Sequence, residues 1–159
     1  MNKYGYIPMW ILVKVLSFGI VSELYAILKY DDQKDIADIY NTSPETLTLY
    51  LSMIANFRNL CAHEEILYDY RTQKVIPDNH IHKELNISRS EDGYKYGKND
   101  LFALVIMMKT LLSGNEFRSM MYELGYEIDI LDKKIQVVPL SDILNKIGFP
   151  DNWKDILDL

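Results

Sequence analysis

The chain has 159 residues, 48% of them hydrophobic and 25% charged, which is typical of one globular domain covering residues 1–159 and excludes a disordered chain. Its net charge of −6 argues against broad, sequence-blind binding of nucleic acid through a basic surface but not against a compact site for one phosphate. The single cysteine, Cys61, excludes an internal disulfide and a cysteine-rich zinc site; its apolar neighbours predict a buried structural thiol.

The first predicted helix begins at Pro8 and runs to about Lys29, because apolar residues recur at helical spacing over this stretch. Residues 7–20 are strongly apolar, but Lys14 interrupts them, and the run is shorter than the roughly 20 apolar residues that span a bilayer. We therefore predict a buried core helix, no membrane association and a cytoplasmic protein.

Two further helices are predicted before residue 70. Aspartates at 31–32 begin a short one that places Ile36 and Ile39 on one face. Ser43 can cap the next helix, with a proline at its first position, and the apolar pattern carries it through His63 and as far as Leu67.

Residues 71–98 form a long polar excursion with little helical period, in which residues 75–76 and 85–87 can pack locally or form a short hairpin. His80 and His82 form an H-x-H pair without other metal-ligand spacing, so we predict solvated loop residues and no metal site. The tyrosines at 94 and 96 could stack on bases, but local packing within the loop is the favoured interpretation.

The remaining pattern is helical, and it completes an all-α bundle. Asn99 is predicted to cap a nearly all-apolar helix, and Gly125 and Gly148 are predicted to end two later ones. The expected helices and the ambiguous segment are 101–112, 115–124, 128–138 (ambiguous), 141–147 and a last turn at 152–157.

The best candidate for chemistry is the segment 57–63, Phe-Arg-Asn-Leu-Cys-Ala-His. On a helix, Asn59 and His63 are four residues apart and share a face, and the long side chain of Arg58 can reach part of the way round to them. Histidine moves protons near neutral pH, and arginine binds two phosphate oxygens and stabilises developing charge. The same residues also commonly form caps, salt bridges or structural hydrogen bonds, so spacing alone leaves both interpretations open.

Four stretches resemble one family in the expected order. Residues 57–65, ending His-Glu-Glu, resemble the signature of the Abi-like abortive-infection proteins of the AbiD/AbiF type, a branch of the HEPN superfamily. Similar resemblances cover the remaining three stretches, which are Tyr-Ile-Pro-Met-Trp at 6–10 with Ser-Phe-Gly at 17–19, Tyr-Gly-Lys-Asn-Asp-Leu-Phe-Ala at 96–103, and Gly-Phe-Pro-Asp-Asn-Trp at 148–153.

The resemblance implies a HEPN-like helical bundle and a metal-independent endoribonuclease that needs no cofactor. It implies an RNA substrate and a homodimer that pairs two R-x₄-H motifs in one cleft, with Arg58, Asn59 and His63 as the catalytic residues. Weaker candidates for binding or orienting the substrate are Glu23, Glu64 and Lys98.

Members of this family usually carry another helical region before the part that resembles this chain, so the chain is expected to correspond to their C-terminal half. An antitoxin or that missing N-terminal region is therefore an expected partner. The alternative is a non-catalytic HEPN module that binds RNA or another protein through the same residues.

Overall fold

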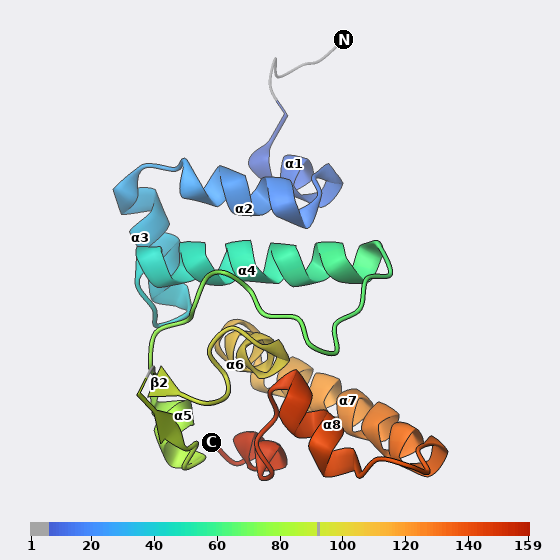
Figure 1. Ribbon diagram of the computed structural model, residues 1–159. Coiled ribbons are helices and arrows are strands. Elements are labelled where there is room, and N and C mark those ends of the chain that lie inside the picture. Colours follow the sequence, from blue (N-terminus) through green and yellow to red (C-terminus); the bar gives the residue numbers. More distant parts are fainter. Residues whose placement is uncertain (1–6, 92) are drawn as a thin grey trace. The chain divides into compact units, whose positions relative to one another are not determined.

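The computed structural model describes residues 7–91 and 93–159, without the side chains of Met9 and Val13. The chain divides into two compact units, Met1–Asn56 and Phe57–Leu159, and each is described by itself. Apart from one two-stranded sheet, the regular structure of the described residues is helical (Figure 1), which confirms the all-α prediction. In the part of the chain that the structure describes, no helix has the length and apolar character needed to cross a membrane.

The first unit opens with two helices where one was predicted. Helix α1 (Met9–Val15) and helix α2 (Phe18–Ala26) are separated by Leu16, whose backbone is extended. Ser17 then caps α2, because its hydroxyl accepts a hydrogen bond from the backbone N–H of Ile20 at 3.4 Å. A residue that favours capping thus interrupts an apolar pattern that alone would continue the helix.

Helix α3 (Tyr30–Ile39) carries the predicted aspartates in its first turn, where they favour the positive end of the helix dipole. The side chain of Gln33 donates to the backbone oxygen of Tyr25 at 2.9 Å, and the Tyr25 hydroxyl donates back to the oxygen of Gln33 at 2.9 Å. This reciprocal pair joins α2 to α3. Ile39, which the pattern places on one face with Ile36, is 73% exposed, whereas Ala37 is fully buried.

Helix α4 (Pro44–Ala62) begins as predicted: the Ser43 hydroxyl accepts from the N–H of Thr46 at 3.1 Å, and Pro44 occupies the first helical position. Its predicted extension as far as Leu67 is wrong. The chain leaves the helix after Ala62, and Glu64 adopts a left-handed conformation with φ of 55°. The candidate motif therefore lies at the C-terminal end of a long helix.

The segment 71–98 is a long excursion, as predicted, but it has its own structure. It contains helix α5 (His80–Glu84) and a short antiparallel pair, β1 (Arg89–Ser90) and β2 (Gly93–Tyr94). Buried apolar side chains along this segment join it to the core of the second unit; they are Ile76, Ile81, Leu85 and Ile87. A segment anchored this often behaves as part of the fold rather than as a free loop.

The rest of the second unit is helical. Asp100, one residue later than predicted, caps helix α6 (Leu101–Leu111). Helix α7 (Gly114–Lys134) starts with a capping box of Ser113 and Glu116 and continues through Gly125, so the predicted stop there is wrong. A Cβ placed on Gly125 would lie 4.0 Å from its nearest neighbour, an atom of Trp153, which is an ordinary contact, so the helix passes this glycine without a special steric requirement.

The C-terminal elements complete the core of the second unit. Helix α8 (Leu140–Ile147) ends at Gly148, whose φ of 102° is left-handed, as the predicted stop requires. A short 3₁₀ helix, η1 (Trp153–Leu157), contacts α7. The core side chains meet as packed rings, with Phe149 5.3 Å from Phe102 and 5.4 Å from Trp153 between ring centroids.

Candidate functional site

The last two turns of α4 separate an inner face from an outer one. Phe57 is 2% exposed and Leu60 is 9% exposed. The ring of Phe57 packs edge-on against Tyr70 with the ring centroids 5.7 Å apart. These contacts fix the rotation of the helix end, and the residues between them must then face outward.

Arg58, Asn59 and His63 are all exposed on that outer side. One guanidinium N–H of Arg58 donates to the amide oxygen of Asn59 at 3.3 Å, and the backbone N–H of His63 donates to the backbone oxygen of Asn59 at 3.0 Å. The side chain of Asn59 thus contacts that of Arg58, and the backbone bond places His63 one helical turn further on. The guanidinium has further donors for an anion, and the arrangement can present a cation, an amide and an imidazole to one ligand.

Two neighbours of the motif share this exposure. Glu64 is exposed in its left-handed conformation just beyond the helix. Cys61 is exposed as well, so the predicted buried thiol is wrong. The reason is geometric: Cys61 follows the inward-facing Leu60 by one residue, about 100° around the helix, and this rotation turns it toward solvent.

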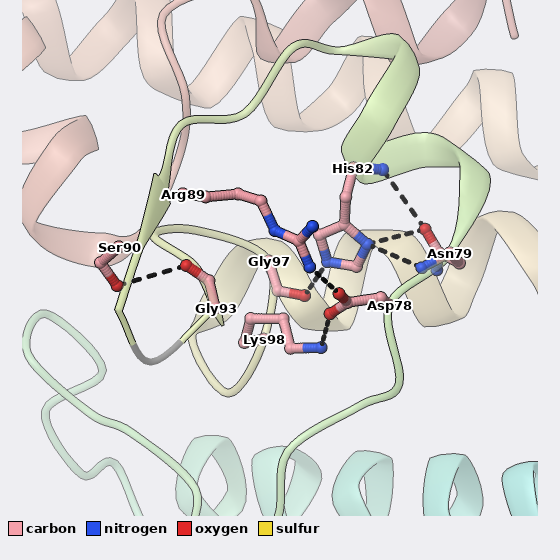
Figure 2. A network of polar contacts seen from close by, with 8 residues as sticks. All are labelled: Asp78, Asn79, His82, Arg89, Ser90, Gly93, Gly97 and Lys98. Carbon is pink, nitrogen blue, oxygen red and sulfur yellow. Dashed lines mark hydrogen bonds and ion pairs between the residues drawn. The ribbon is translucent and has the colours of Figure 1, made fainter.

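The two weaker candidates on other elements have separate surroundings. Glu23 is exposed on α2, in the first compact unit. Lys98 is largely covered, with a side chain 15% exposed, and its ammonium contacts the carboxylate of Asp78 at 2.6 Å. Arg89 binds the other oxygen of the same carboxylate at 2.6 Å (Figure 2). The principal contact of Lys98 is therefore a structural ion pair, and its proposed role toward substrate stays a prediction.

His82 corrects another expectation, because it is completely buried rather than solvated. Its ring nitrogen Nε2 lies 2.8 Å from the backbone oxygen of Gly97, and its Nδ1 lies 3.2 Å from the backbone nitrogen of Asn79 (Figure 2). The ring stacks on Tyr94 with centroids 4.9 Å apart, and burial lowers the pKa of the imidazole. Asn79 with a histidine three residues later is a capping box, and that spacing was the signal for this structural role.

Gly97 also binds a buried carboxylate. Its N–H donates to both oxygens of Asp100 at 3.1 and 3.0 Å, and the N–H of Ala103 donates to the first of these oxygens at 2.9 Å. Burial raises the pKa of Asp100 to about 6, against the lowering effect of these hydrogen bonds. We call His82, Gly97 and Asp100, together with Gly148, the Gly97 cluster; a Cβ on Gly148 would overlap the Asp100 side chain.

Across residues 7–91 and 93–159, no group of three or more His, Cys, Asp or Glu side chains is arranged to hold a metal ion. His80, the other member of the H-x-H pair, is exposed. The pair is thus split between solvent and core, because residues two apart on a helix do not face each other.

Comparison with known proteins places the motif within a family match. No curated protein and no solved structure matches the chain. Residues 1–69 match the model of one protein family, and this range includes Arg58, Asn59 and His63. The family is described as Abi-like protein, so the predicted resemblance to the Abi-like family is confirmed for this part of the chain.

Proposed function

We propose that the chain is a metal-independent endoribonuclease of a bacterial abortive-infection (phage-defence) or toxin system, acting in the cytoplasm as a HEPN-type enzyme. The match of residues 1–69 to the Abi-like family supports the abortive-infection role. The observation that carries the catalytic part is the joint exposure of Arg58, Asn59 and His63 at one helix end, with Arg58 held to Asn59.

The chemistry follows from these three groups. RNA carries its own nucleophile, the 2′-hydroxyl, which attacks the adjacent phosphorus while the bond to the 5′-oxygen breaks. His63 would move the protons of this step, a contribution of about 10²–10⁴ in rate. Arg58 would hold the phosphate oxygens as their charge grows, and Asn59 would orient the guanidinium. The products would be a 2′,3′-cyclic phosphate and a 5′-hydroxyl.

The active unit is a homodimer in this proposal. The three residues lie on the outer surface of one helix end, where water has free access. A second copy placed across a two-fold axis would bring two R-x₄-H motifs into one cleft and exclude water from it. An antitoxin, or an N-terminal region such as the family's usual one, would regulate access to that cleft.

The decisive experiment compares three purified proteins on a labelled single-stranded RNA: the wild type, His63→Ala and His80→Ala. Loss of His63 should reduce the cleavage rate at least 100-fold, because no proton-transfer group remains. His80 is also an exposed histidine, and its loss should leave the rate unchanged. EDTA should leave wild-type cleavage intact, and the 3′ ends should be cyclic phosphates.

Equal cleavage by wild type and His63→Ala would refute the catalytic assignment. The dimer is tested separately by sedimentation, and its removal by an interface substitution should abolish cleavage with the motif unchanged. An active monomer would contradict the proposed paired cleft.

A second candidate function is a non-catalytic module that binds RNA or another protein. It is favoured by large apolar side chains on the surface of the first unit: Trp10 is 67% exposed, Val15 76% and Ile27 78%. Where exposed apolar side chains gather into one patch, they commonly mark a contact surface. If RNA binds equally to wild type and His63→Ala while neither cleaves it, this function is the correct one.

A further inference from the structure

The second unit contains a polar cavity of about 320 Å³ that the motif at the end of α4 does not line. It is open to solvent on one side and lined by segments far apart in the sequence: the residues after α5, those after β2, helix α8 and the turn before η1. Its lining includes the polar or charged side chains of Lys95, Tyr96, Asn145, Asp151 and Asn152. Its volume lies at the lower end of small-ligand sites, which run from about 300 to 1,000 Å³.

Hydrogen bonds within the wall fix two amides. The hydroxyl of Tyr96 donates to the amide oxygen of Asn145 at 2.9 Å, which leaves the amide nitrogen as the donor of that side chain. The amide nitrogen of Asn152 donates to the backbone oxygen of Leu85 at 3.1 Å, which leaves its oxygen as an acceptor. The wall therefore has one oriented amide donor and one oriented amide acceptor before any ligand arrives.

Two charges complete the lining. The ammonium of Lys95 lies 4.9 Å from the centre of the Tyr96 ring. Contact with Tyr96, with a smaller contribution from Asp151, raises the pKa of Lys95, so its charge is retained. The carboxylate of Asp151 is exposed, and among the described residues it forms no hydrogen bond or ion pair. The cavity lining thus combines an available carboxylate, an ammonium group, one amide donor and one amide acceptor.

We propose that this cavity binds a guanine base. The Watson–Crick edge of guanine has two adjacent donors, N1–H and the N2 amino group, beside the acceptor O6. Asp151 would accept both donors through its two oxygens, and the amide nitrogen of Asn145 would donate to O6. Adenine has no such pair of donors, so the carboxylate discriminates against it. Lys95 would bind the phosphate of the same nucleotide.

The guanine could belong to a free nucleotide or to an unpaired residue of an RNA strand, because both present the same edge. The proposal stands independently of the cleavage proposed for Arg58 and His63. It is tested by binding alone, so inactivity of the protein as a nuclease would leave it untouched.

Calorimetric titration of the full chain with GMP, IMP and AMP tests directly whether the cavity recognises the Watson–Crick edge of guanine. GMP should bind most tightly, IMP about 10-fold more weakly because it lacks the N2 amino group, and AMP more weakly still. Asp151→Asn should weaken the binding of GMP about 10–100-fold and leave the binding of AMP unchanged. Asp158→Asn, which alters an exposed carboxylate outside the cavity, should change neither.

The oligonucleotides UUGUU and UUAUU decide whether the bound guanine belongs to an RNA strand or to a free nucleotide. A UUGUU affinity well above that of GMP assigns the cavity to unpaired RNA, and equal affinities assign it to the free nucleotide. Equal binding of GMP and AMP, or unchanged GMP binding by a folded Asp151→Asn protein, would overturn the proposal. So would the failure of GMP and UUGUU to bind at millimolar concentration.

Discussion

The end of α4 and the Gly97 cluster use similar side chains in opposite settings. At the end of α4, His63 is exposed and its neighbour Asn59 holds Arg58 on the surface. In the Gly97 cluster, His82 is fully buried and its ring nitrogens contact the backbone of Asn79 and Gly97. Saturated, buried polar groups hold a fold together, whereas exposed groups with spare donors remain available to a ligand. The two regions should therefore respond differently to substitution.

The largest expected effect on stability is that of Gly148→Ala. This glycine has a φ of 102°, and an added Cβ would overlap the buried Asp100 side chain. Backbone strain and overpacking together should lower the free energy of unfolding by about 3–5 kcal/mol. Urea unfolding measures the change, and Gly114→Ala is the control because nothing lies within 4 Å of its added Cβ. A comparable loss in both variants would show that Gly148 is not specially constrained.

The next effect concerns pH. Because burial raises the pKa of Asp100 to about 6, the folded state holds this proton more tightly than the unfolded state does. The resulting stability is complete below about pH 4 and is lost as the pH rises through 6. Relative to Asp100→Asn, the wild type should lose roughly 3 kcal/mol between pH 4 and 7.

Urea unfolding of both proteins at several pH values measures this difference. The lowered pKa of His82 acts in the opposite direction, since acidification must charge a buried imidazole, but both proteins carry His82 and its contribution cancels. A difference between wild type and Asp100→Asn that stays constant with pH would contradict the assignment.

A smaller effect is expected at the cap of α5. Asn79 accepts from the backbone N–H of His82 at 3.3 Å, and Asn79→Ala removes this acceptor. The free energy of unfolding should fall by about 1–2 kcal/mol. Asn79→Asp keeps an acceptor at the same place and should restore most of the stability in thermal unfolding. An equal loss of stability in Asn79→Ala and Asn79→Asp would mean that the amide acts through other contacts.

The smallest effect on stability belongs to the motif. Arg58→Ala and His63→Ala remove exposed side chains, so each should change the free energy of unfolding by less than about 0.5 kcal/mol. Urea unfolding measures this beside the cleavage assay. If either variant loses as much stability as Gly148→Ala does, the end of α4 has a structural role like that of the Gly97 cluster, and the contrast between the two regions fails.

Local signals predicted part of this fold correctly. The caps at Ser43 and Gly148 were recognised because the chemistry of a helix end depends on a few adjacent residues. Gly125 was mistaken for a stop because one glycine is a weak local signal, and the helical pattern on both sides of it carries α7 through. Leu16 and Ser17 ended a helix inside an apolar run for the opposite reason, since a local cap outweighed the period.

For the site, the sequence identified residue types but not their surroundings. His63 and His82 are the same amino acid near a helix end, and only the fold exposes one and buries the other. The guanine cavity was missed because its lining comes from four separate segments: Tyr96 was noted as a possible base-stacking residue, but its proximity to Asn145 and to residues 150–152 depends on the fold. The pairing of two motifs in a dimer depends on a second copy, which the periodicity of a single chain does not encode.

The exposure of Cys61 has a practical consequence. It is the single thiol of the chain, and it lies in the same helical turn as Asn59 and two residues before His63. A maleimide dye or nitroxide will therefore attach at one place without prior mutagenesis. Two such labels in a dimer would report the separation of the two helix ends by energy transfer or dipolar spectroscopy, and one label would report an RNA strand arriving beside it.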